Sequence, residues 1–168
     1  MTLSKDDPVV KEWQRLLRYA RETTAVLDAD LVRDREISLE DYDVLFQLQG
    51  AGGALRMTDL TLAVLITKSS CTRLVDRLVS RGLVERKTSE GDRRSVQVQI
   101  TKQGRAVLRR AALTHLRGID AVFASRLTDR DLSDLRRILN HLATQHEAPD
   151  FIDSSAEEPR KPFHLISR

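Results

Sequence analysis

Between Thr67 and Ile100 the spacing of apolar residues changes from a helical period to a period of two. The first part, "KSSCTRLVDRLVSRG", predicts an amphipathic helix that Thr67 can cap and that Gly82 ends. At about 100° per residue, its apolar side chains fall on one arc: Cys71, Leu74, Val75, Leu78 and Val79. The second part, "SEGDRRSVQVQI", alternates Val96, Val98 and Ile100 with polar residues, which predicts a strand with one buried face. A helix followed by a β-hairpin is therefore expected.

Basic side chains are concentrated in this segment. Residues 67–94 contain eight basic and four acidic side chains, whereas the rest of the 168-residue chain contains 20 basic and 21 acidic ones. Arg93 and Arg94 follow a Gly-Asp turn signal at the expected hairpin tip, and Arg73 and Arg77 lie on the polar side of the expected helix. This distribution predicts a polyanionic partner. Ion pairing on the helix surface, with Asp76 beside both helix arginines, is the alternative interpretation.

Amphipathic helices are predicted on both sides of this segment. The predicted N-caps are Asp7 (before Pro8), Ser38 and Thr128 (each with an aspartate three residues later, Asp41 and Asp131), and Thr101. Apolar stripes run along the long helices: Val10, Trp13, Leu17, Ala20, Thr24, Leu27 and Leu31; Leu108, Ala112, His115, Ile119 and Val122; and Leu132, Leu135, Leu139 and Leu142. One small lobe cannot cover these stripes, so a helical homodimer interface is expected. "GAGG" at 50–53 is interpreted as a linker that ends a helix, because it lacks the spacing of a phosphate loop.

A short helix from about Thr58, a turn at Ile66 and Thr67, the amphipathic helix and the hairpin together predict a winged helix-turn-helix. The predicted fold is mainly α with a small β-hairpin wing. The winged helix-turn-helix lobe spans 38–100, and dimerisation helices at 8–36 and 102–147 flank it. These ranges form a single domain over 1–147, and a poorly ordered tail is expected over 148–168.

The stretch "TRLVDRLVSRGLVERKTSEGDRRSVQVQITKQG" resembles the core signature of the MarR family of bacterial transcriptional regulators. The resemblance extends over about Leu39 to Leu142, and Ile100 stands where leucine is usual. It implies a homodimer that binds a pseudo-palindromic operator on double-stranded DNA through helix 67–81 and wing 88–95. It also implies that Asp92 orients Arg94 toward the minor groove, and that a small molecule modulates DNA binding. The expected DNA-binding residues are Thr67, Lys68, Ser69, Ser70, Thr72, Arg73, Arg77, Asp92, Arg93 and Arg94.

A small aromatic effector is expected where the dimer helices meet the winged lobe. The expected lining residues are Trp13, Leu17, Tyr42 and His115, and core packing is the alternative role for Trp13 and Tyr42. Cys71 is expected to be a buried apolar residue rather than a redox switch, since no neighbour in the sequence would stabilise a thiolate.

Several other functional classes are not expected. No apolar run is long enough for a membrane span and the start of the chain lacks the apolar core of a signal peptide, so a cytoplasmic protein without a membrane partner is expected. The four histidines lack metal-site spacing, and no catalytic motif occurs, so we expect neither a metal, a cofactor nor enzyme activity. A winged-helix module that binds another protein, without sequence-specific DNA binding, remains the alternative function. Retention on DNA or heparin that weakens steeply with salt would separate the two.

Overall fold

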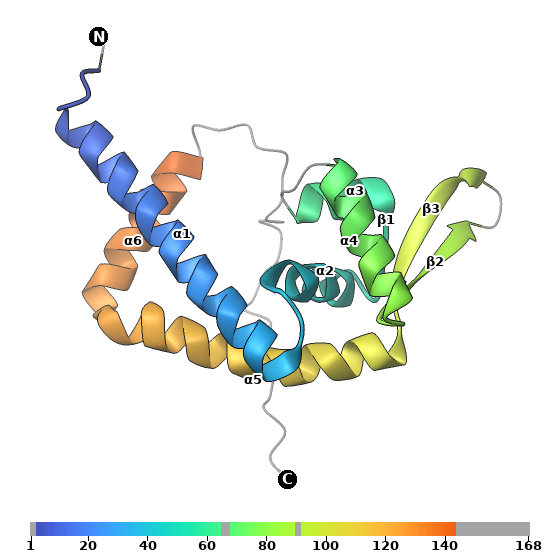
Figure 1. Ribbon diagram of the computed structural model, residues 1–168. Coiled ribbons are helices and arrows are strands. Elements are labelled where there is room, and N and C mark those ends of the chain that lie inside the picture. The colour runs from blue at the N-terminus through green and yellow to red at the C-terminus, as the bar shows by residue number, and fades with distance from the viewer. Residues whose placement is uncertain (1–2, 65–67, 90–91, 144–168) are drawn as a thin grey trace. The chain divides into compact units, whose positions relative to one another are not determined.

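Most of the described chain is helical, with one small antiparallel sheet (Figure 1). The computed structural model describes residues 3–64, 68–89 and 92–143, and for residues 68–69, 88–89 and 92–95 it describes the backbone alone. In chain order the elements are α1 (Pro8–Arg35), α2 (Leu39–Gly50), β1 (Ala54–Arg56), α3 (Met57–Ala63), α4 (Lys68–Ser80), β2 (Val84–Ser89), β3 (Asp92–Ile100), α5 (Lys102–Val122), the 3₁₀ helix η1 (Ala124–Arg126) and α6 (Asp129–Ala143). The predicted fold class is confirmed.

The chain divides into two compact units, Met1–Arg126 and Leu127–Arg168, and α6 is the helix described in the second. In the first unit α2 packs against α5, α3 and α4, and α1 packs against α5. Figure 1 shows the hairpin β2–β3 extending away from the unit on the side opposite to α1. The prediction of a single domain over 1–147 stays a prediction, and the expected tail at 148–168 lies outside the described residues.

Hydrogen bonds confirm four of the five predicted N-caps. Asp7 Oδ1 accepts from the Val9 N–H at 2.9 Å. Ser38 and Asp41 form a complete capping box, with both bonds at 3.1 Å. The Thr101 hydroxyl accepts from the Gly104 N–H at 3.0 Å, and Thr128 and Asp131 bond reciprocally at the start of α6. These side chains satisfy donors that a helix start leaves without partners, so the helix boundaries follow from the sequence. The predicted cap Thr67 and the turn at Ile66 lie outside the described residues.

The sheet has a strand that the sequence analysis did not predict. Its order is β1-β3-β2, and β1 pairs antiparallel with residues 97–99 of β3. Gly52 and Gly53 adopt φ values of 80° and 110°, which let the chain reverse from the end of α2 into β1. The GAGG segment thus ends the helix as predicted and also brings β1 beside the hairpin.

The hydrophobic core joins the end of α1 to the winged lobe. Its fully buried members include Leu31, Leu45, Leu60, Leu78 and Val98. Cys71 is also fully buried, as predicted. Packing of α2, α4 and the sheet around this core holds the polar side of α4 toward solvent.

Two residues expected in the core are partly exposed. Val79 is 37% exposed because it lies at the edge of the apolar arc of α4, about 80° from Cys71 on a helix of 100° per residue. Val96 is also 37% exposed, since it lies toward the hairpin tip, beyond the part of β3 that pairs with β1.

The buried face of α5 is rotated relative to the predicted stripe. Its buried residues are Gly104, Leu108, Ala111, Thr114 and Gly118, whereas the predicted Ala112, His115, Ile119 and Val122 are only partly buried. The small residues let other backbone and side chains approach α5 closely, which a hydrophobicity pattern does not register.

Candidate nucleic-acid interface

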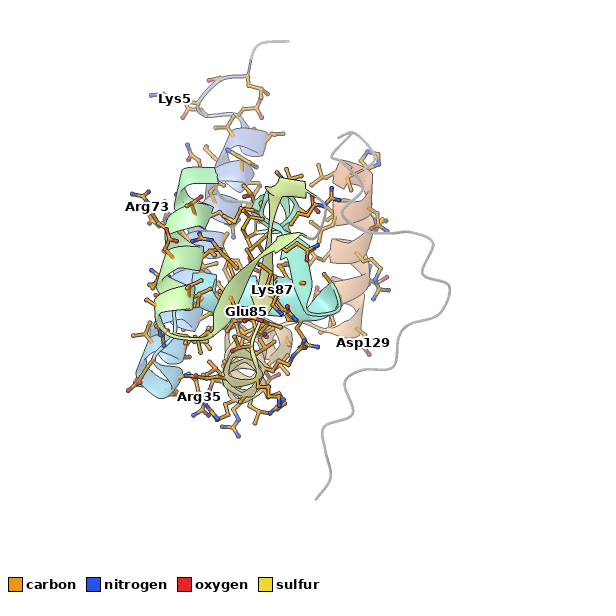
Figure 2. The ribbon with its side chains drawn as sticks, turned by 90° about the vertical axis from the view of Figure 1, so that its right-hand side faces the viewer. Lys5, Arg35, Arg73, Glu85, Lys87 and Asp129 are labelled. Carbon is orange, nitrogen blue, oxygen red and sulfur yellow. The ribbon has the colours of Figure 1, made fainter. Side chains whose placement is uncertain are left out.

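The helix α4 has one buried side and one solvent side. Cys71, Leu74, Val75 and Leu78 are buried, while Arg73, Asp76 and Ser80 are exposed. Figure 2 shows Arg73 on the outer side of α4, pointing away from the domain. The solvent side therefore presents a long cationic side chain on a helix fixed from behind by apolar packing.

Arg77 does not extend freely from this surface. Its guanidinium donates from Nε and Nη2 to Asp41 Oδ1, at 3.1 and 2.7 Å, and from Nη2 to the Ser38 hydroxyl at 3.2 Å. The side chain is 48% exposed, whereas that of Asp41 is 3% exposed. The expected ion-pair partner Asp76 is not the one found, because the start of α2 supplies the carboxylate instead.

Arg81 completes the same group of side chains. Its Nη1 donates to Asp41 Oδ2 at 3.2 Å and its Nη2 donates to the Glu36 carbonyl oxygen at 2.7 Å. We call Ser38, Asp41, Arg77 and Arg81 the Asp41 cluster. It connects the C-terminal half of α4 to the junction between α1 and α2.

Asp76 contacts the hairpin instead. It forms an ion pair with Arg86 of β2, and Arg86 also donates to the Thr72 carbonyl oxygen at 3.5 Å. The backbone of α4 is thus linked to β2 as well as to α2. These bonds fix the angle between the helix and the hairpin.

The structure describes the side chains of only some of the predicted DNA-binding residues. Arg73, Arg77, Ser70 and Thr72 lie on α4, and the backbones of Lys68 and Ser69 form its start. The backbones of Asp92, Arg93 and Arg94 form the start of β3. Thr67 and the wing side chains lie outside what the structure describes, so the predicted bracing of Arg94 by Asp92 stays a prediction.

Two of the predicted effector residues meet between α2 and α5. The rings of Tyr42 and His115 lie with their centroids 4.5 Å apart, and Tyr42 also stacks on Phe46 at 6.0 Å. Phe46 is 50% exposed, so this aromatic group reaches from the core to solvent.

Burial changes the acid–base behaviour of this group. It lowers the pKa of His115, an effect that the charge of Asp43 opposes. It raises the pKa of Asp43, while a hydrogen bond from Gln47 and the charge of His115 act in the opposite direction. The His115 Nδ1 atom is buried without a hydrogen-bond partner in the described part of the chain.

Trp13 and Leu17 do not join Tyr42 within one chain. They are 58% and 50% exposed on the N-terminal half of α1, and Leu31 is the residue of α1 that packs in the core with Tyr42. At 1.5 Å per residue, Trp13 lies about 27 Å along α1 from Leu31. A hollow of about 220 Å³ is lined by other residues: Arg33, Asp34, Arg35, Glu36, Val107 and Arg110.

Sequence reasoning missed the roles of Asp41, Arg81 and Arg86. The capping-box pattern identified Asp41, but only as a partner of Ser38. The i, i+4 spacing of Arg77 and Arg81 on one side of a helix is the signal that could have indicated a shared carboxylate.

The described ranges, residues 3–64, 68–89 and 92–143, contain neither a metal-binding cluster nor a membrane-spanning helix. No group of three or more histidine, cysteine or acidic side chains there is placed to hold a metal ion. Likewise, no helix in that part of the chain is both long and apolar enough to cross a bilayer.

Comparison with known proteins gives a consistent result. A family model described as "MarR family" matches residues 36–95. The HTH-type transcriptional regulator PecS of Dickeya dadantii is 30% identical over 109 residues, which are 64% of this chain and 65% of PecS. The match thus spans slightly less than two thirds of that relative.

Solved structures match over more of the chain. AbsC, a MarR family transcriptional regulator from Streptomyces coelicolor, has a TM-score of 0.78 and 28% identity, covering 86% of this chain and 97% of AbsC. Sco3205, a MarR family regulator from the same organism solved in complex with DNA, has the same TM-score and identity and covers 89% of this chain and 93% of that one.

Proposed function

We infer from these similarities that the chain is a member of the MarR family, and from this premise we propose that it regulates transcription by binding double-stranded DNA as a homodimer. The observation that carries the proposal is the outward basic side of α4, held between a buried apolar side and the hairpin. We propose further that the protein acts as a cytoplasmic repressor and not as an enzyme.

α4 is the proposed recognition helix. An α-helix with side chains is about 10–12 Å across and fits the major groove, which is about 12 Å wide. Arg73 on the outer side of α4 is suited to bidentate hydrogen bonds with guanine. Lys68, Ser69, Ser70 and Thr72 belong to the first turns of the helix, from which phosphates and base edges can be reached.

The wing is the second proposed contact. Arg93 and Arg94 follow the turn of the hairpin, and the family resemblance implies that Asp92 orients Arg94 toward the minor groove. The link from Asp76 to Arg86 supports this role, because it holds the hairpin and α4 as one unit. A minor-groove or phosphate contact adds affinity but little sequence information.

A homodimer would cover the apolar side chains that one chain leaves exposed. On α1 these include Val9, Trp13, Leu16 and Leu17, each at least 50% exposed. Leu139 and Leu142 of α6 are exposed to a similar degree. Large uncovered apolar surfaces are typical of protein interfaces. Two copies would place two recognition helices about one helical turn apart on DNA.

A small aromatic effector is proposed to bind near Tyr42 and His115. Their contact between α2 and α5 supports this position, and Trp13 and Leu17 could contribute only if the second copy brings them near. Such a ligand changes DNA affinity only if it binds the DNA-competent and incompetent arrangements differently.

The test is selection of duplexes from a random-sequence library with the purified protein, followed by titrations of the best duplex and of a scrambled one at several salt concentrations. The proposal predicts a preferred pseudo-palindrome and an affinity that falls steeply with salt. Equal, weak binding to both duplexes would instead favour a protein-interaction module.

A further inference from the structure

We propose that Asp41 is a positioning residue for selective DNA binding, because it fixes the orientation of α4 and keeps Arg77 and Arg81 from binding DNA phosphates. The inference rests on the proposed function, since it assumes that α4 enters the major groove. It assigns a role to a residue that makes no contact with DNA itself.

The Asp41 carboxylate is buried and fully bonded. Its Oδ1 accepts two hydrogen bonds from Arg77, and its Oδ2 accepts one from Arg81 and one from the Ser38 N–H. A buried carboxylate is costly unless it is paired and hydrogen-bonded, and here each oxygen has two donors. The arginines are therefore held strongly, although their own side chains are 48% and 35% exposed.

The cluster ties α4 to two other helices. Ser38 and Asp41 form the capping box of α2. Leu39, the first residue of α2, donates its N–H to Asp28 of α1 at 2.7 Å. Arg81 adds a bond to the Glu36 carbonyl oxygen at the α1–α2 junction. Movement of α4 relative to α2 would break the bonds of Arg77 and Arg81 to Asp41.

The hydrogen bonds of the Asp41 cluster constrain the rotation of α4 about its axis, which the apolar core does not. Leu74, Val75 and Leu78 hold α4 against the core, but apolar contacts are not directional. The forked guanidinium bonds of Arg77 require a defined geometry. They fix the rotation of α4 about its axis, and this rotation determines where Arg73 points.

The same bonds withhold positive charge from DNA. A free arginine can neutralise any phosphate, which raises affinity for all sequences alike. Pairing with Asp41 neutralises one of the two positive charges and occupies hydrogen-bond donors of both Arg77 and Arg81. Asp41 therefore increases operator binding and decreases binding to arbitrary DNA.

The substitution Asp41→Asn tests this directly. Asparagine keeps the size and can accept from the Ser38 N–H, but it lacks the charge that holds the arginines. The probes are the best duplex from the wild-type selection and a scrambled duplex of the same composition. We expect operator affinity to fall about tenfold. We expect scrambled-duplex affinity to rise, with a salt dependence steeper by about one to two units per dimer.

Glu40→Gln is the matched control. It removes the same charge from the preceding residue, whose side chain is 66% exposed and whose Oε2 lies 3.9 Å from Arg77 Nη2. We expect both affinities to stay within about twofold of wild type, because exposed pairs at this distance contribute little. Replacing Arg77 and Arg81 by glutamine in the Asp41→Asn background should abolish the gain on scrambled DNA.

A purely structural role for Asp41 would lower both affinities together, and that result would overturn the inference while leaving the proposed function intact. If the Asp41→Asn variant does not fold, Arg77→Lys is the alternative test, since lysine keeps the positive charge but lacks the forked geometry of the guanidinium group. The inference predicts reduced operator affinity spread over all base positions, whereas loss at one position would identify Arg77 as a base contact and overturn it. Absence of DNA binding by the wild type would refute the proposed function itself.

Discussion

Gly104 of α5 lies directly against the backbone carbonyl of Leu83, so a β-carbon on Gly104 would overlap the Leu83 oxygen. The neighbouring Thr101 hydroxyl accepts from the Gly104 N–H and donates to the Gly82 carbonyl oxygen at 2.8 Å. The start of α5 is therefore fastened to the chain just before β2. These contacts connect the base of the hairpin to α5, the helix that packs against α1.

Gly104→Ala should lower the free energy of unfolding by at least about 2 kcal/mol, because backbone atoms must move to admit the methyl group. Gly118→Ala is the comparison, since its β-carbon would overlap the end of the Leu27 side chain, at 2.5 Å, and no backbone atom of another element. Its steric cost should be offset by the helix propensity of alanine, about 1 kcal/mol. Denaturant unfolding of both variants checks this, and equal losses would contradict it.

Replacing both Trp13 and Leu17 by glutamate should convert the proposed dimer into monomers. Both side chains are at least half exposed in one chain and neither belongs to its core cluster, so the substitutions remove little packing within it. They would place charges in the dimer interface, where unpaired charge is costly. Sedimentation measures the result, and circular dichroism serves as the folding control. A wild type that is already monomeric at micromolar concentration would contradict the dimer.

Acid should destabilise the protein through His115. Burial lowers its folded-state pKa below the ordinary 6.5, so the unfolded state binds more protons as the pH falls through about 6.5. Stability is therefore lost on acidification in the window from 6.5 down to the folded-state pKa. Asp43 acts in the opposite direction at lower pH, because its raised pKa makes the folded state bind the extra proton.

His115→Gln should flatten the stability profile just below pH 6.5, since glutamine cannot be protonated there. Thermal unfolding midpoints at closely spaced pH values measure this. His141→Gln, in α6, is the control for a histidine outside the aromatic group. An equal effect of the two substitutions would show that burial of His115 is not the cause.

The helices and caps could be predicted because their determinants are local. Asp7, Ser38, Thr101 and Thr128 each bond within three residues, and such bonds depend on sequence spacing. β1 could not be predicted, because a strand of three residues has almost no pattern of its own. Its pairing partner, residues 97–99 of β3, lies more than 40 residues away in the sequence.

The candidate site was predictable to a lesser extent. Periodicity placed Arg73 on the outer side of α4, but the partner of Arg77 lies 36 residues away on another helix. Similarly, Tyr42 and His115 were chosen separately and meet only because α2 packs against α5. In both cases the contact depends on how distant helices pack together, which the sequence pattern does not show.

A small aromatic acid or phenol should raise the thermal stability of the wild type and lower its operator affinity. At a concentration 100 times its dissociation constant, such a ligand would add about 2.7 kcal/mol. Tyr42→Ala should reduce the stabilisation if the ring contacts the ligand. A broad panel that changes neither quantity would rule out this class of effector.

The wing and the recognition helix should differ in what their arginines contribute. Arg94 belongs to the hairpin, where phosphates and the minor groove carry little sequence information. Arg94→Ala should therefore weaken binding to operator and scrambled duplexes together, and flatten the log–log salt dependence by about one unit per wing. Asp92→Ala should weaken binding less, because the positive charge of Arg94 stays.

Arg73→Ala should instead cost about 1–3 kcal/mol on the preferred duplex and relax base preference at particular positions. Arg73 points outward from α4, and α4 is the helix proposed to enter the major groove, which distinguishes all four base pairs. Its effect on scrambled DNA should be the smaller one. In the dimer the affected positions should recur in both half-sites, about 10 base pairs apart from centre to centre. Titrations of the two variants on both duplexes across a salt series distinguish the roles. A uniform loss for Arg73→Ala, with unchanged base preference, would mean that α4 contacts only the DNA backbone.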